Sequence, residues 1–422
     1  MTNHNRMTFT RRQALLGGTA LLASAGLTGI HSHRASGSTT PERPAPTWGR
    51  IANESRQGQR ILTGLFFGGP PNPNSLPLYT RHPATPKQLD WTDQSDIRFA
   101  LRQFASTGLN TLKLSYFGHQ GETDRFAPAW LFSQRRWPGD GEGTYTEAEQ
   151  IERARQLFTT AAELDLVVAP MVEVGLDFFR FWQDFPFNLD ELVRRAGWLL
   201  RNFGNEPNYL RVYDSQGQPR PVVWLIETIH VGPVTPQDFA AGFDRAAELL
   251  HEQTGHRPGW IIDPTPLPGY GSHDGPDPAA LRTTPSVLAI NPFNITTQGP
   301  GAFKDQVLIS EDERLAYARN IMTTWASSNS GIPFIAPVLP GYDAHIVFPP
   351  PRTTIYGFNP DWRLRQQQLA VEFGTDGLSV DTWNGNTEGY AIPPTLEDGD
   401  IHLEWLHETV AAVRERWAAS AP

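Results

Sequence analysis

The residues best suited to acid–base chemistry lie together in one short segment, Asp381–Thr395. It contains two carboxylic acids, Asp381 and Glu388, beside the aromatic rings of Trp383 and Tyr390, and a glycine that follows Glu388 lets the backbone turn sharply. Paired carboxyl groups can divide proton donation and charge stabilisation between them, and flat rings stack on the C–H faces of sugars. The segment therefore predicts a site that binds carbohydrate and transfers protons.

Further polar and aromatic side chains follow the other apolar runs of the chain. We expect a shared substrate site formed by Trp383, Asn384 and Tyr390 together with Tyr116, His119, Glu173, His230, Asp263, Asn291, Tyr342 and Asp343. For the second catalytic carboxyl group beside Glu388, Glu227 ranks first, because it ends the apolar run Trp224–Ile226. Asp381 ranks second, ahead of Glu173 and Asp263.

These side chains need elements that bring them to one place, and the sequence supplies eight repeats of a strand followed by a helix. The expected strands are Ile61–Gly69, Thr111–His119, Leu166–Gly175, Pro221–His230, Gly259–Pro266, Val287–Asn294, Pro333–Asp343 and Gly377–Trp383. The expected helices are Asp96–Ser106, Glu147–Leu164, Asp190–Phe203, Gln237–Thr254, Pro278–Thr284, Asp312–Ser327, Asp361–Phe373 and His402–Ala418.

Eight such units close most naturally into a single (β/α)8 TIM barrel of the α/β class. The rival, a doubly wound sheet, lacks its glycine-rich fingerprint, because prolines 70 and 71 follow the first strand. Active sites of this barrel lie at the carboxyl ends of the strands. The long connections Gly69–Ser95, Gly118–Thr146 and Tyr342–Pro360 are expected on that same face.

The N-terminus resembles a twin-arginine export signal. Arg11 and Arg12 precede a weakly apolar stretch, Ala14–Ile30, that is short and rich in glycine for a membrane span. We expect residues 1–35 to be a signal peptide that engages the twin-arginine translocase, 36–55 to be a Pro/Ser-rich linker, and 56–422 to be the catalytic domain. The mature protein is then periplasmic or extracellular, without a stable membrane anchor.

Composition narrows the chemistry further. The formal net charge of −10 argues against nucleic acid as a partner, and the absence of cysteine excludes a thiol nucleophile, a zinc–thiolate site and a lipid anchor. No cofactor is expected. His119, His230, His273 and His345 could converge with Asp263 and Asp343 on a metal, but no HExxH or HxH spacing is present, so we expect no metal site.

Two motifs carry a resemblance to a known group of enzymes. One comprises Trp383, Asn384, Glu388, Gly389, Ile392 and Pro394; the other runs through Pro207–Val212, Gly217–Pro219 and Pro221–Val223. They resemble the last-strand pattern and the entry to the fourth strand of glycoside hydrolase families 99 and 71, the endo-α-mannosidases and α-1,3-glucanases. The resemblance implies an exported barrel glycosidase with Glu388 as general acid/base.

One position departs from that pattern. The endo-α-mannosidase group has a second glutamate, which assists attack by the sugar's own 2-hydroxyl, at the position held here by Gly385. That mechanism therefore does not carry over. Either a different carboxylate completes the site, or the barrel binds carbohydrate without cleaving it; a metal-dependent barrel hydrolase is the less favoured alternative. Carboxyl groups about 5–5.5 Å apart would indicate retention of configuration, and roughly 6.5–9.5 Å inversion.

Overall fold

The computed structural model describes residues 47–66, 79–85, 93–116, 146–173, 189–226, 235–264, 277–293, 295, 310–326, 331–346, 355–386 and 388–420. Its central sheet is built from eight parallel strands: β1 (Ile61–Phe66), β2 (Thr111–Tyr116), β3 (Val167–Glu173), β5 (Pro219–Ile226), β6 (Gly259–Ile262), β7 (Val287–Ile290), β8 (Ile335–Val338) and β11 (Gly377–Val380). The helices between and after them are α1 (Gln94–Ser106), α2 (Glu147–Glu163), α3 (Leu189–Phe203), α4 (Pro236–Thr254), α5 (Pro278–Arg282), α6 (Glu311–Ala326), α7 (Pro360–Phe373) and α8 (Ile401–Ala419).

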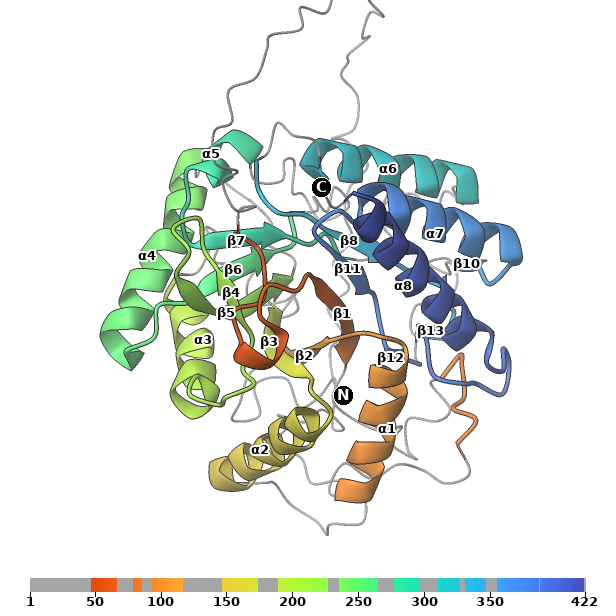
Figure 1. The fold of residues 1–422 in the computed structure, drawn as a ribbon, viewed down its shortest axis with the longest axis horizontal. Helices are drawn as coiled ribbons and strands as arrows, with labels where there is room; N and C mark the ends of the chain where they lie inside the picture. The colour runs from red at the N-terminus through yellow and green to blue at the C-terminus, as the bar shows by residue number, and fades with distance from the viewer. Residues whose placement is uncertain are drawn as a thin grey trace, which may run out of the picture. The chain divides into compact units, whose positions relative to one another are not determined.

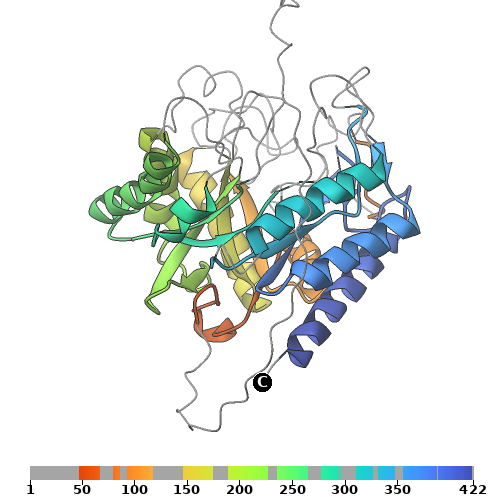
Figure 2. The same ribbon diagram turned by 90° about the horizontal axis from the view of Figure 1, so that it is seen from above.

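The strands follow the order β7-β6-β5-β3-β2-β1-β11-β8, so the first and last units of the chain are neighbours. A parallel bridge between Ile290 and Phe334 links the two ends of this order, with a 2.9 Å hydrogen bond from the Ile290 N–H to the Pro333 carbonyl. Figure 1 shows the strands at the centre with the helices around them, and α6, α7 and α8 lie side by side in both Figure 1 and Figure 2. The predicted single (β/α)8 barrel is confirmed.

Two apolar cores follow from the alternation of side chains along the strands. On β3, Val167, Ala169 and Met171 belong to the cluster inside the barrel, whereas Val168 and Val172 belong to the cluster between strands and helices. Because both faces of each strand are covered, the strands are apolar almost throughout. A polar residue at an inward position is therefore costly unless it is partnered.

Short elements complete the two ends of the barrel. Antiparallel β4 (Arg211–Tyr213) pairs with β5, and the 3-10 helix η1 (Glu54–Arg56) precedes β1. At the opposite end lie the ribbon of β9 (Gly341–Asp343) and β10 (Ile355–Gly357) and the hairpin of β12 (Asn384–Gly385) and β13 (Tyr390–Ala391).

Local sequence signals explain where several helices begin. Thr146 and Glu149 form a capping box on α2, in which each side chain accepts a hydrogen bond from the other residue's backbone N–H. Thr235 and Asn359 cap helices whose first residue is a proline, Pro236 and Pro360. These caps fix the helix starts and hence the lengths of the loops that precede them.

Residues 47–55, at the end of the expected linker, hydrogen-bond with the barrel. Ile51 bridges Val212, and the Asn53 side chain donates to the carbonyl oxygens of Pro207 and Tyr209. The expected signal peptide and residues 36–46 lie outside the described residues, as do most of the three long connections. Among the helices that are described, none is long and apolar enough to cross a membrane.

Candidate active site

Glu388 lies at the tip of the β12–β13 hairpin, directly beyond the carboxyl end of β11. Asn384 pairs with Ala391 and Gly385 with Tyr390, and the Glu388 N–H donates to the Gly385 carbonyl at 3.2 Å. Gly389 adopts a φ of +77°, a conformation that residues with a Cβ rarely adopt. The Glu-Gly pair is thus a tight turn that fixes the direction of the Glu388 side chain.

Two tyrosine hydroxyls hold the carboxyl group of Glu388. The Tyr342 hydroxyl donates to Oε1 at 2.7 Å, the Tyr390 hydroxyl donates to Oε2, and the two rings stack with their centres 5.4 Å apart. Burial raises the pKa of Glu388 and outweighs the two hydrogen bonds, which act to lower it. The side chain nevertheless retains partial exposure. A partly accessible carboxyl group with a raised pKa is suited to donating a proton.

The ring of Tyr390 also fills the space beside Gly385. A Cβ atom at residue 385 would lie 2.3 Å from two Tyr390 ring carbons and 2.4 Å from the Thr382 hydroxyl oxygen. No larger side chain fits there without moving the tyrosine. The absence of a side chain at Gly385 is therefore coupled to the packing of Tyr390, which binds Glu388.

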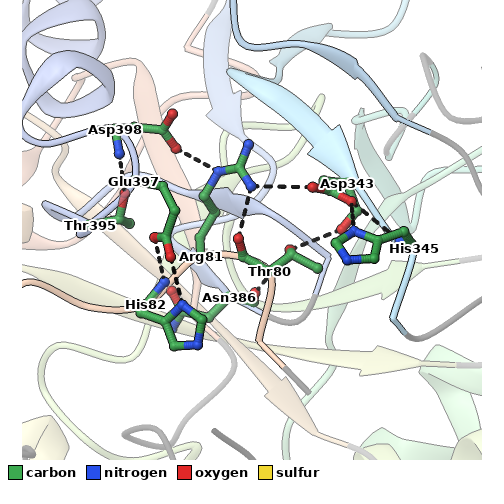
Figure 3. A network of polar contacts seen from close by, with 9 residues as sticks. All are labelled: Thr80, Arg81, His82, Asp343, His345, Asn386, Thr395, Glu397 and Asp398. Carbon is green, nitrogen blue, oxygen red and sulfur yellow. Dashed lines mark hydrogen bonds and ion pairs between the residues drawn. The ribbon is translucent and has the colours of Figure 1, made fainter. Parts of the chain in front are cut away.

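A second network fixes the backbone of the same turn. Residues 79–85, here called the strap, run across the hairpin: Arg81 pairs with Asp343 at 3.2 Å and with Asp398 at 2.5 Å (Figure 3). The same Asp343 donates its backbone N–H to the Glu388 carbonyl at 2.8 Å. On its other side Asp343 contacts His345, with 2.5 Å between the His345 Nδ1 and the carboxylate. The Asp343 carboxylate is thus bound to two side chains rather than open to a ligand.

A buried polar centre lies inside the barrel, around the fully buried Lys113 of β2. Its ammonium group donates to Asn291 Oδ1 at 3.1 Å and to Ser379 Oγ at 2.9 Å, and it pairs with Asp381 Oδ1 at 3.3 Å. Trp224 donates its indole N–H to the same Asn291 oxygen at 3.1 Å. Burial lowers the pKa of Lys113 and Asp381 opposes that shift. Three acceptors match the three N–H donors of an ammonium ion, and through them Lys113 links β2 to β11 and to the residues that directly follow β7 and β11.

The barrel is similar in fold to solved structures of glycoside hydrolases. An endo-alpha-mannosidase of family GH99 from Bacteroides thetaiotaomicron aligns with 85% of this chain and 99% of its own, at 16% identity and a TM-score of 0.56. An endo-beta-1,4-mannanase from Thermotoga petrophila aligns with 86% of this chain and 78% of its own, at 11% identity and a TM-score of 0.51. The chain shares the (β/α)8 barrel fold of these two enzymes. No family model and no curated protein matches the sequence.

Within this barrel, the predicted site residues separate into groups. Glu388, Tyr390, Tyr342 and Asp343 come together at the hairpin, and Asn384 is partly exposed in β12. Asp381 and Asn291 belong instead to the Lys113 centre. Asp263, after β6, is buried near that centre, acts electrostatically on Lys113, and accepts the Phe293 N–H at 3.1 Å.

Two predicted aromatic residues face helices. The Tyr116 ring stacks on Trp198 of α3 with the ring centres 5.4 Å apart, and Trp383 meets Phe104 of α1 edge to face at 5.1 Å. Both side chains are at most 1% exposed. The predicted residues His119, Glu227 and His230, and the side chain of Glu173, lie outside the described residues.

Sequence reasoning missed Lys113 and Arg81. A signal for Lys113 was present, because a charged residue between Leu112 and Leu114 in a strand buried on both faces must find partners inside the barrel. Arg81 lies in a Pro-rich connection without periodicity and offered no such signal. Within the described ranges, no group of three or more His, Cys, Asp or Glu residues is arranged to hold a metal ion.

Proposed function

We propose that this chain is a glycoside hydrolase in which Glu388 is the general acid. The observation that carries the proposal is the Glu388 carboxyl group, held by two tyrosine hydroxyls at the carboxyl end of the barrel with a raised pKa. Such a group remains protonated closer to neutral pH than an ordinary glutamate and can deliver that proton to the oxygen of the leaving sugar. The shared barrel fold supports the assignment.

The tyrosines have a definite role in this reaction. When Glu388 gives up its proton, the hydroxyls of Tyr342 and Tyr390 donate to the resulting carboxylate. Hydrogen bonds to an ionised group are stronger than those to a neutral one, so these donors stabilise the charge that develops as the bond breaks. The arrangement suits a group that starts protonated and ends ionised.

A second carboxylate must act on the other face of the sugar ring. Gly385 supplies none, and the Asp381 carboxylate is bound to Lys113 and Ser379 in the interior. We therefore propose Glu227 as nucleophile or base, followed by Glu173, and we assign Asp381 to the electrostatic support of the barrel centre. Export through the twin-arginine route, with residues 1–35 as signal peptide, is part of the same proposal.

A non-catalytic carbohydrate-binding barrel is the second candidate. It is favoured by Gly385, since Tyr390 fills the space where the endo-α-mannosidase pattern has its other glutamate. The two candidates differ in turnover but not in sugar binding.

The decisive experiment incubates the purified protein with α-mannan, α-glucan and aryl glycosides and measures released sugar, with Glu388→Gln in parallel. Loss of a general acid is expected to lower kcat by roughly 10²- to 10⁴-fold on substrates with poor leaving groups. The control is Glu408→Gln, an exposed glutamate on α8, which is expected to match the wild type. Full activity of Glu388→Gln would refute the assignment; sugar binding without turnover in the wild type would favour the binding barrel.

A further inference from the structure

We propose that Arg81 is a positioning residue that holds Glu388 and Tyr342 in their working geometry. The proposal rests on the proposed function, because it concerns the same acid. Arg81 lies on the strap, outside the barrel strands and helices, and does not itself contact the Glu388 carboxyl group. It acts through Asp343 and the backbone of the hairpin.

The Arg81 side chain is held on several sides at once. Its Nε pairs with Asp398 at 2.5 Å, and its Nη1 binds Asp343 at 3.2 Å and the Thr80 carbonyl at 2.8 Å. The guanidinium lies over the Phe358 ring, 3.9 Å from its centre, and the side chain is only 12% exposed. Figure 3 shows Arg81 between the two aspartates, with Asn386 of the hairpin nearby.

The strap backbone binds both sides of the turn that carries Glu388. The N–H groups of Thr80 and Arg81 donate to the Asn386 carbonyl at 3.0 and 3.2 Å, two residues before Glu388. The Thr80 hydroxyl donates to the Asp343 carbonyl at 3.0 Å. The Asp343 N–H in turn donates to the Glu388 carbonyl. Asp343 also leaves no room for a side chain at Gly389, because a Cβ atom there would lie 2.8 Å from the Cβ of Asp343.

These contacts link three segments that are far apart in the sequence: the strap after β1, the β9 ribbon after β8, and the hairpin after β11. Tyr342, which binds Glu388, precedes Asp343 directly, so a shift of Asp343 moves both the Glu388 backbone and its hydrogen-bond donor. Only a planar guanidinium with divergent N–H groups satisfies two carboxylates, a carbonyl and a ring at once. A lysine keeps the charge but not this geometry.

The test compares Arg81→Met and Arg81→Lys with the wild type, in the full chain. Arg60→Met is the matched control: Arg60 also donates to a backbone carbonyl, that of Thr375, and lies over an aromatic ring, that of Trp417, but it precedes β1 at the opposite end of the barrel. Two quantities are measured: kcat and KM on a hydrolysed glycoside, and the substrate-free titration of Glu388 by carboxyl infrared difference spectra against Glu388→Gln.

We expect both Arg81 variants to lose about 100-fold in kcat with little change in KM, because misplacing a catalytic group by about 1 Å has that order of effect. The Glu388 titration should move to higher pH in Arg81→Met, since loosening Tyr342 weakens a hydrogen bond that lowers the pKa. Arg60→Met should leave kcat and the titration unchanged. If Arg81→Met fails to fold, Arg81→Lys carries the test.

Wild-type kcat in either Arg81 variant, or a full rescue by lysine, would overturn the positioning role, because lysine preserves only the charge. A wild type that hydrolyses no glycoside refutes the proposed function instead. In that case the infrared titration still decides the inference: an unchanged Glu388 titration in Arg81→Met overturns it, and a displaced titration supports it.

Discussion

Two polar clusters lie at the same end of this barrel, and their carboxyl groups have partners of opposite kinds, one charged and one neutral. In the interior, Asp381 has a cation as its partner, the ammonium group of Lys113. At the hairpin, seven residues later, the described polar partners of the Glu388 carboxyl group are neutral hydroxyls, and burial raises its pKa. Asp381 thus faces a buried basic group, whereas Glu388 lies among neutral donors and its raised pKa suits it to exchange a proton.

The difference also bears on stability. Because the pKa of Glu388 is raised in the folded state, this carboxyl group contributes stability that is fully present below its unfolded pKa and is lost as the pH rises through its folded pKa. The Lys113–Asp381 pair is a buried pair in which each partner depends on the other. The contrast is consistent with the proposed catalytic role of the hairpin and with a structural role for the interior pair.

The largest effect, a loss of folding stability, is expected for Lys113→Met, which removes the buried partner of Asp381. The change leaves Asp381 as a buried charge without its cation, and breaking a buried pair in this way typically costs about 3–5 kcal/mol. Chemical denaturation followed by circular dichroism would measure the free energy of unfolding.

The double variant Lys113→Met/Asp381→Asn provides the control, because it removes both charges. It should be more stable than Lys113→Met alone, and the thermodynamic cycle gives the coupling between the two residues. Additive losses would show that the pair does not act as a unit and would remove the contrast with Glu388.

Gly385→Ala is expected to have the next largest effect, now at the hairpin. The added methyl group must displace the Tyr390 ring, 2.3 Å away, and with it one of the two donors to Glu388. Overpacking of this kind costs about 1–3 kcal/mol in stability, and we expect kcat to fall about tenfold as well.

Gly197→Ala in α3 is the matched control, because its added Cβ meets the flexible tip of Arg201 at 3.1 Å and a Leu250 methyl group at the ordinary contact distance of 3.4 Å. Denaturation midpoints and initial rates of both variants would be compared. If Gly385→Ala were as active and stable as Gly197→Ala, the packing of Tyr390 would not constrain Glu388.

The fold was predictable from sequence because its signals are local. The expected strand Val287–Asn294 and helix Pro278–Thr284 begin where β7 and α5 begin. The prediction extended β6 to Pro266, whereas the strand ends at Ile262, because an apolar pattern does not show where a strand leaves the sheet. β4 was missed because three residues carry no usable periodicity.

The site was predictable only where its residues are neighbours in sequence. Glu388 and Tyr390 lie two residues apart in one motif, but Lys113 is 268 residues from Asp381 and Arg81 is 262 from Asp343. The sequence also did not show which face of the barrel the aromatic side chains take. Tyr116 and Trp383 were predicted at the site, yet their rings face α3 and α1. Which face a strand residue takes depends on pairings that a single sequence does not show.

The smallest effect, and the most specific to Glu388, is expected for Tyr342→Phe. Loss of one hydrogen bond of about 0.5–1.5 kcal/mol should lower kcat roughly three- to tenfold. The Tyr342 hydroxyl acts to lower the pKa of Glu388, so its removal raises that pKa further. A general acid works only while protonated, so the alkaline limb of the kcat/KM profile should move to higher pH. Tyr356→Phe, in the same ring stack, serves as control and should keep the wild-type limb. An alkaline limb that stays in place while the acid limb moves to higher pH would mean that Glu388 acts in its ionised form, and would transfer the acid's role to another residue.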